Sequence, residues 1–166
     1  VPVGAISRSP LLSGNYRVGQ EGGQGNALGR IIFRFPNNFS VFLDDTSSPG
    51  VFQRDNRGVS HGCVRVQRPF DLACFLFPER PDDWMLDKLR ISMGMQPETD
   101  KGRKYVNGLE PDAKPKLISW QKVSPRVPIY ITYYTLFPVP GGQLTSYPDV
   151  YGYDKVLASA LATFRK

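Results

Sequence analysis

The chain has 166 residues and a formal net charge of +6, with 40% hydrophobic and 22% charged residues. This length and composition predict one compact, soluble domain and exclude the disordered and fibrous classes. No apolar run approaches the roughly 20 residues that cross a bilayer, and the first residues lack the pattern of a signal peptide. We therefore expect any export to be directed by residues outside this sequence.

Charge and cysteine content disfavour two further classes. The basic residues are scattered along the chain without a nucleic-acid-binding fingerprint, so nucleic acid is not the expected partner. Two cysteines and one histidine make neither a four-ligand zinc site nor a disulfide framework. A single bridge from Cys63 to Cys74 could form, but Cys74 lies in the apolar run "FDLACFLF" and is predicted to be a small buried hydrophobe.

The first regular structure is predicted after a loop-rich segment over residues 1–25 that is dense in glycine, serine and proline. Two short strands are predicted over Arg30–Pro36 and Phe39–Leu43, because both are β-branched or aromatic and both are followed by turn residues.

Two helices are predicted next. In "RPFDLACFLF", Phe70, Ala73, Cys74 and Phe77 recur at the spacing of one helical face. Asp82 is predicted to cap a second helix that Gly94 ends.

The remainder of the chain is predicted to add strands. A loop with a short strand at "KYV" follows the second helix, the strongest strand covers "RVPIYITYYTLFPV", and "PGGQLTSYPDVYGYD" forms a hairpin-like turn with a weak further strand. These elements predict a mainly β architecture with two helices, of the α+β class.

The segment "GVSHGCVRVQ" holds the chain's one histidine, two positions before Cys63. In an extended segment His61, Cys63 and Arg65 share one face, and Val64 and Val66 turn toward the core. A cysteine reacts as its thiolate, which an imidazolium, an arginine or backbone N–H groups stabilise. A reactive thiol is the interpretation favoured over a structural Cys/His pair, and the amides of Gly62 and Cys63 could serve a developing oxyanion.

At this point "SHGCVRV", Ser60 to Val66, resembles the nucleophile motif of the L,D-transpeptidase catalytic domain (YkuD type). "GNALGR", "FPNNFSVFLDDT", "RPFDLACFL" and "VPIYITYYT" resemble further segments of this family, and "KYVN" and "DVYGYD" favour its YcbB-like branch. The resemblance covers roughly Asn15 to Asp154. It implies the L,D-transpeptidase β-sandwich, without its N-terminal hairpins, as a catalytic domain over residues 26–166.

What the resemblance implies is acyl transfer between peptidoglycan stem peptides in the periplasm or cell envelope, with Cys63 as nucleophile. It implies no cofactor and no metal, and it implies that carbapenems acylate the same thiol. Ser60, Gly62 and Arg65 are the expected substrate and oxyanion residues, with Arg65 either binding a substrate carboxylate or locking the loop to a carbonyl.

The family's usual histidine base, about 19 residues before the cysteine, corresponds to Asp44 in this chain. The proton acceptor is then His61 or Asp44. Asp44 could also orient His61, or its charge could raise the Cys63 pKa and suppress activity. Two alternatives stay open: a weakened member that binds peptidoglycan or a partner, and an L,D-carboxypeptidase. A papain-like hydrolase is disfavoured, because no histidine follows His61.

Overall fold

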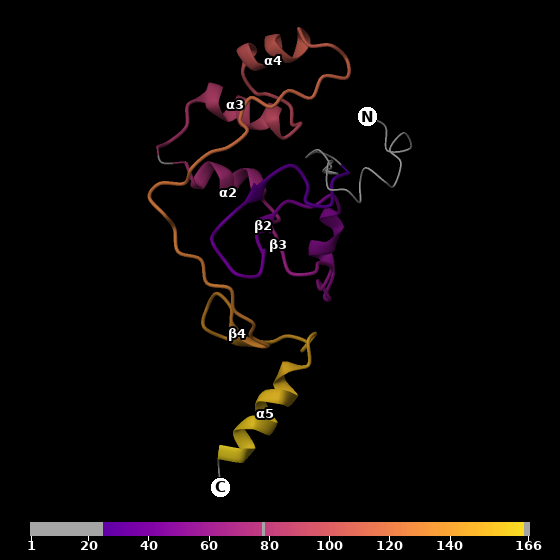
Figure 1. The fold of residues 1–166 in the computed structure, drawn as a ribbon, viewed down its shortest axis with the longest axis vertical. Helices are drawn as coiled ribbons and strands as arrows, with labels where there is room; N and C mark the ends of the chain where they lie inside the picture. The colour runs from indigo at the N-terminus through magenta and orange to yellow at the C-terminus, as the bar shows by residue number, and fades with distance from the viewer. Residues whose placement is uncertain (1–24, 78, 165–166) are drawn as a thin grey trace, which may run out of the picture.

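A small three-stranded sheet lies near the middle of the molecule (Figure 1). The computed structural model describes residues 25–77 and 79–164. Strand β2 (Leu43–Asp44) pairs antiparallel with β1 (Ile32–Phe33) and parallel with β3 (Val64–Arg65). Each strand has two residues, so the sheet is short. Its register determines which side chains of β2 and β3 lie opposite each other at the site.

The second strand starts later than the sequence predicts. The Asn37 side chain donates to the Val41 carbonyl at 2.7 Å and accepts from the Phe39 and Val41 N–H groups at 3.0 and 3.1 Å. These hydrogen bonds hold residues 37–41 as a turn, in which Ser40 takes a positive φ of 54°. A local side-chain network therefore replaces the first part of the predicted strand Phe39–Leu43, and β2 retains Leu43 from it.

Helix α2 (Pro69–Phe75) packs against the sheet through the face that its sequence predicts. Proline at the first helical position has no N–H to leave unpaired, and this favours the start of the helix there. One hydrophobic core has Ala73, Leu89 and Met93 as its buried centre. The four residues predicted to share one helical face all belong to it: Phe70, Ala73, Cys74 and Phe77. The predicted core face is confirmed, although the helix ends at Phe75, two residues before the predicted end at Phe77.

Helix α3 (Asp83–Ser92) begins as predicted, because the Asp82 carboxylate accepts from the Met85 N–H at 2.6 Å. Gly94 follows its end with a φ of +68°. The predicted strand at "KYV" is wrong: these residues belong to helix α4 (Asp100–Asn107). The Thr99 side chain caps α4 by accepting from the Gly102 N–H at 3.0 Å, and this local signal outweighs the β-propensity of the segment.

A buried carboxylate joins α3 to α4. Asp87 is fully buried and accepts hydrogen bonds from the Glu98 N–H at 2.8 Å, the Thr99 N–H at 2.9 Å and the Thr99 hydroxyl at 2.5 Å. Burial works against ionisation, yet these donors and Arg90 lower the pKa of Asp87 to about 2. Asp87 therefore remains an anion and ties the two helices together.

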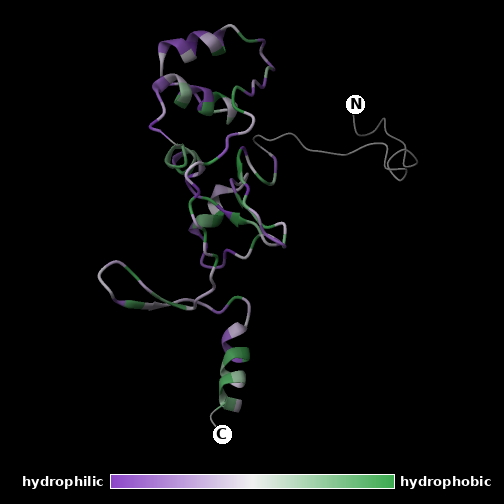
Figure 2. Cartoon of the chain, turned by 60° about the vertical axis from the view of Figure 1, so that its left-hand side comes forward, coloured by the Kyte–Doolittle hydropathy of each residue, from purple (hydrophilic) through white to green (hydrophobic). Residues whose placement is uncertain are grey.

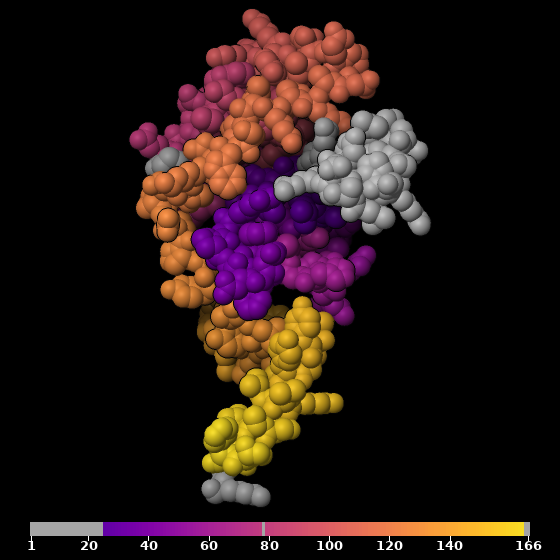
Figure 3. Space-filling model, in the orientation of Figure 1, coloured from indigo at the N-terminus to yellow at the C-terminus, as the bar shows by residue number. Residues whose placement is uncertain are grey.

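The strongest predicted strand, Arg126–Val139, forms only near its end, where β4 (Leu136–Pro138) lies. Residues 127–134 form no strand in the described part of the chain, and Tyr130 is 85% exposed. The predicted hairpin does form: β4 (Leu136–Pro138) pairs antiparallel with β5 (Leu144–Ser146). Helix α5 (Tyr153–Phe164), where no helix was predicted, projects away from the body with every residue exposed and a largely hydrophobic surface (Figures 2 and 3).

The described residues therefore correct the predicted fold class in part. They hold four α-helices and five strands of two or three residues, a mixed α+β protein in place of a mainly β one with two helices. Helices persist because caps and core faces are local, whereas long strands need partners along their whole length. The predicted loop before Gly25 lies outside the described residues. No helix within the described ranges has the length and apolarity needed to cross a membrane.

Candidate active site

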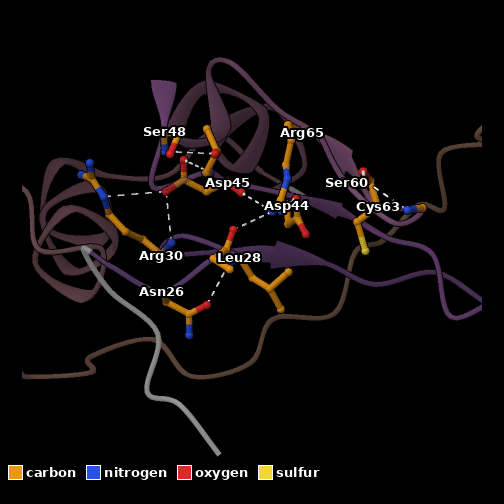
Figure 4. Close-up of polar contacts among 12 residues, drawn as sticks. Asn26, Leu28, Arg30, Asp44, Asp45, Ser48, Ser60, Cys63 and Arg65 are labelled. Atoms are coloured by element: carbon orange, nitrogen blue, oxygen red, sulfur yellow. Dashed lines mark hydrogen bonds and ion pairs between the residues drawn. The ribbon is translucent and has the colours of Figure 1, made fainter. Parts of the chain in front are cut away.

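The sheet register places an acidic and a basic side chain opposite each other. Asp44 on β2 is the direct partner of Arg65 on β3, and Asp44 Oδ1 lies 2.8 Å from Arg65 Nη1 (Figure 4). Directly paired residues project from the same side of a sheet, which brings the carboxylate to the guanidinium. Both side chains are shielded from water, with 0% of the Asp44 side chain and 16% of the Arg65 side chain exposed.

Arg65 also ties three backbone segments together. Its Nη1 donates to the Ala27 carbonyl at 2.8 Å and to the Asp45 carbonyl at 3.2 Å, in addition to Asp44. Of the two roles that the sequence leaves open for Arg65, the contacts in the structure are those of a lock on neighbouring carbonyls.

Cys63 lies directly before β3 and lines a groove of about 310 Å³, together with residues 51–52, 57–60, 62, 64–65 and Tyr151. Cys63 is half-buried. Val64, predicted to point inward, is instead 41% exposed and lines the same groove, because β3 begins only at this residue and the preceding loop does not extend its alternation.

Ser60 and Gly62 shape the loop that carries the thiol. The Ser60 hydroxyl donates to the Cys63 carbonyl at 2.5 Å and accepts from the Gly62 N–H at 3.1 Å. Gly62 has a φ of +153°, and a Cβ there would lie 3.0 Å from the Val41 side chain. The Gly62 N–H is therefore engaged within the loop, while the Cys63 N–H has no hydrogen-bond acceptor among the described residues.

The environment of Asp44 shifts its acidity. Burial raises the pKa of Asp44 above its ordinary value, and the charge and hydrogen bond of Arg65 and the Cys63 thiol work in the opposite direction. Its second oxygen, Oδ2, is buried without a conventional hydrogen-bond partner among the described residues. Asp44 therefore has a thiol nearby and one carboxylate oxygen without a hydrogen-bond partner among the described residues.

His61 lies apart from this pair. Its side chain belongs to an exposed residue of the loop, and within the described part of the chain the imidazole makes no hydrogen bond or ion pair. The structure brings Cys63, Asp44 and Arg65 together and leaves His61 at the surface.

Two groove residues were not singled out from the sequence. Arg57 lines the groove with only its Nε engaged, donating to the Arg54 carbonyl at 2.9 Å. Tyr151 reaches the groove from near the C-terminus of the chain. Arg57 directly precedes the segment "GVSHGCVRVQ", and this position is a signal that could have identified it, whereas the position of Tyr151 depends on tertiary structure.

The second cysteine occupies a different environment. Cys74 packs against the hydrophobic core on α2, and burial, together with the charge of Asp71, raises the pKa of its thiol. No group of three metal-ligating side chains gathers among the described residues.

The fold is of the α+β class, and its candidate site is a half-buried cysteine beside a buried ion pair. Comparison with known proteins shows what the chain is similar to: residues 2–76, which include Cys63, Asp44 and Arg65, match the model of the L,D-transpeptidase catalytic domain, YkuD. A Haemophilus influenzae protein named "Putative L,D-transpeptidase" is 29% identical over 140 residues, covering 84% of this chain. The chain spans 24% of the length of that relative. The predicted resemblance to the YkuD-type catalytic domain is therefore confirmed, whereas the YcbB-like branch stays a prediction.

Proposed function

We propose that the chain carries cysteine-dependent L,D-transpeptidase activity and cross-links peptidoglycan stem peptides. The observation that carries the proposal is the Cys63 thiol, which opens onto a groove and has the buried Asp44 carboxyl as its neighbour. The family match supports this assignment, because the thiol and the carboxyl both lie within residues 2–76.

The proposed reaction has two acyl-transfer steps. The Cys63 sulfur attacks the carbonyl carbon of the third residue of a tetrapeptide donor, and the bond to the terminal D-Ala nitrogen breaks. That nitrogen receives the proton given up by the thiol, and D-Ala leaves as a free amine. A thioester joins the donor to Cys63. The side-chain amine of an acceptor stem peptide then attacks the thioester carbonyl, forms the new amide and returns the sulfur as a thiol.

Asp44 is the proposed acceptor of the thiol proton. The Cys63 thiol is among the groups that influence the pKa of Asp44, and the net rise of that pKa, caused chiefly by burial, makes Asp44 a better base than an ordinary aspartate. Arg65 would then hold the carboxyl in place and stabilise negative charge beside the sulfur. The Cys63 N–H, which has no acceptor within the described residues, is the proposed donor to the oxyanion.

The exposed guanidinium of Arg57 supports an anionic substrate. Stem peptides carry carboxylates, and the Arg57 Nη atoms have no partner among the described residues. Arg65 is engaged with Asp44 and two carbonyls, so Arg57 is the groove cation better placed to pair with a substrate carboxylate.

The site of action proposed from the family is the cell envelope, in the periplasm, and the branch proposed is the YcbB-like one. The sequence motifs "KYVN" and "DVYGYD" support the branch. The chain spans 24% of the length of its Haemophilus influenzae relative. Any activity taken from that longer protein is therefore also a proposal for this chain.

The experiment that tests the function is intact-mass measurement after treatment with meropenem. We expect one covalent adduct on the wild-type chain and on Cys74→Ala, and none on Cys63→Ala. Incubation with a tetrapeptide donor should give a thioester on the same two proteins. A wild-type chain that forms neither adduct would refute the proposal.

A weakened family member is the second candidate function. The observation in its favour is that Asp44 is paired with Arg65 and that His61 makes no described contact with the thiol. Such a protein would bind stem peptides without acyl transfer. Restoring the usual family residue by Asp44→His should then raise the acylation rate, whereas the same change in a working Asp44 enzyme should not.

A further inference from the structure

The C-terminal part of the chain contributes a side chain to the Cys63 groove. Tyr151 lines the groove although it lies far from Cys63 in the sequence. A second contact supports this placement, because a Cβ on Gly58 would lie 3.5 Å from the Val150 side chain. Residues 150–151 therefore lie against the loop that leads into the SHGC motif.

The turn that presents Tyr151 is fixed by one carboxylate. Asp149 accepts from the Tyr133 hydroxyl at 2.7 Å and the Tyr153 N–H at 3.0 Å through Oδ1, and from the Asp154 N–H at 2.8 Å through Oδ2. The Tyr133 hydroxyl in turn accepts from the Tyr151 N–H at 3.4 Å. Asp149 and Tyr133 thus hold the backbone on both sides of Tyr151, and none of these hydrogen bonds involves the Tyr151 hydroxyl.

Neighbouring rings set the orientation of the Tyr151 side chain. The centroid of its ring lies 5.1 Å from that of Tyr133 and 5.7 Å from that of Tyr153. These distances are those of favourable aromatic pairs. Tyr151 remains 60% exposed and lines the groove, so these ring contacts leave surface of the side chain available to a ligand.

We propose that Tyr151 is a substrate-positioning residue, whose ring packs against the aliphatic part of the acyl-donor peptide bound in the Cys63 groove. This inference rests on the proposed function. The groove also has the apolar side chains of Val51, Phe52 and Val59, which suit the methylene groups of a diamino acid and the methyl group of alanine. Asp149 is a positioning residue for the turn that holds the ring.

The test measures binding separately from chemistry. Isothermal titration calorimetry of the tetrapeptide donor uses the Cys63→Ala chain, in which no thioester can form. Adding Tyr151→Ala should weaken binding ~10-fold, equal to about 1.4 kcal/mol. Tyr151→Phe, which keeps the ring, and Tyr134→Ala, which removes an exposed ring outside the groove, should each bind within about twofold of the parent.

Kinetics on the chain with Cys63 intact complete the test. Tyr151→Ala should raise the KM for the donor with little change in kcat, and iodoacetamide, which is too small to need the ring, should label Cys63 at the wild-type rate. Asp149→Asn should weaken donor binding in the same direction, because the amide nitrogen that replaces one carboxylate oxygen cannot accept the backbone N–H bound there. Circular dichroism checks that each variant keeps its helices.

The outcomes separate the inference from the function. Tyr151-dependent binding without thioester formation would leave the inference standing and refute the acyl-transfer function. Equal binding by Tyr151→Ala and Tyr134→Ala, or no binding of the donor by the Cys63→Ala parent, would overturn the role of Tyr151. A loss of iodoacetamide labelling in Tyr151→Ala would also overturn it, because the ring would then act on the thiol.

Discussion

Replacing Asp44 by asparagine separates two opposite roles for the carboxyl beside the thiol. The amide side chain would keep a similar shape and an oxygen for Arg65, but it would neither accept a proton nor carry a charge. If Asp44 accepts the Cys63 proton, Asp44→Asn should slow acylation by meropenem and by the donor peptide. If Asp44 instead only repels the thiolate, the same change should speed alkylation of Cys63.

The size of the effect follows from the site. Loss of a general base typically costs about two to four orders of magnitude in rate. We expect a fall of about 100-fold, at the low end, because the unpaired Arg65 would still stabilise the thiolate. Removing one partner of a buried ion pair costs about 3 to 5 kcal/mol. We expect the lower value of about 3 kcal/mol, because the introduced amide oxygen and two backbone carbonyls would still accept from Arg65.

The assay is the rate of adduct formation by intact mass over a range of pH. Because the pKa of Asp44 is raised, the rate should fall on the acid side at a pH above the ordinary aspartate value of 3.8. That acid limb should be absent in Asp44→Asn. Asp45→Asn is the matched control, since Asp45 is also buried but pairs with Arg30. Faster alkylation in Asp44→Asn with undiminished transfer would refute the base role.

Three further predictions concern substrate charge, thiol selectivity and stability. Arg57→Gln should raise the KM for the donor about tenfold and leave the KM for a donor with amidated carboxylates unchanged, and equal effects on both donors would contradict a carboxylate contact. Iodoacetamide with peptide mapping should label Cys63 before Cys74, whose pKa is raised by burial, and the reverse order would count against Cys63 as the reactive thiol. The pKa of Asp87 is about 2 in the folded chain, below the ordinary value of 3.8. The Asp87 anion therefore stabilises the fold above pH 3.8, and this stabilisation is lost as the pH drops through about 2. Asp87→Asn should therefore lower the free energy of unfolding by about 2 kcal/mol near neutral pH, and chemical denaturation that gives no loss would contradict this anion's role.

Sequence patterns predicted the elements whose signals are local. The Asp82 cap, the Gly94 end of α3 and the core face of α2 depend on residues within a few positions of one another, and the structure confirms all three. The hairpin was also predictable, since Gly141 and Gly142 supply the positive φ values that its turn needs.

Features that depend on distant partners could not be read from the sequence. The β-branched and aromatic pattern of residues 127–134 indicates strand propensity, but no strand of the described chain lies beside it to complete the hydrogen bonds. The motif identified Cys63 and Arg65 as candidates, and the position of the family's usual histidine identified Asp44. The pairing of Asp44 with Arg65, however, follows from the parallel register of β2 and β3. Tyr151 in the groove is likewise a product of tertiary structure.

The guanidinium of Arg65 makes position 65 intolerant of exchange. One nitrogen serves the carbonyls of Ala27 and Asp45 and the carboxylate of Asp44, acceptors from separate segments of the chain. A lysine would keep the charge and three donors, but its ammonium is more strongly hydrated and sits on a more flexible stem, so it would be held less firmly at these three acceptors. In a saturation library selected for a reactive Cys63, arginine should therefore be recovered almost alone at this position, while exposed neighbours such as Gln67 accept many residues.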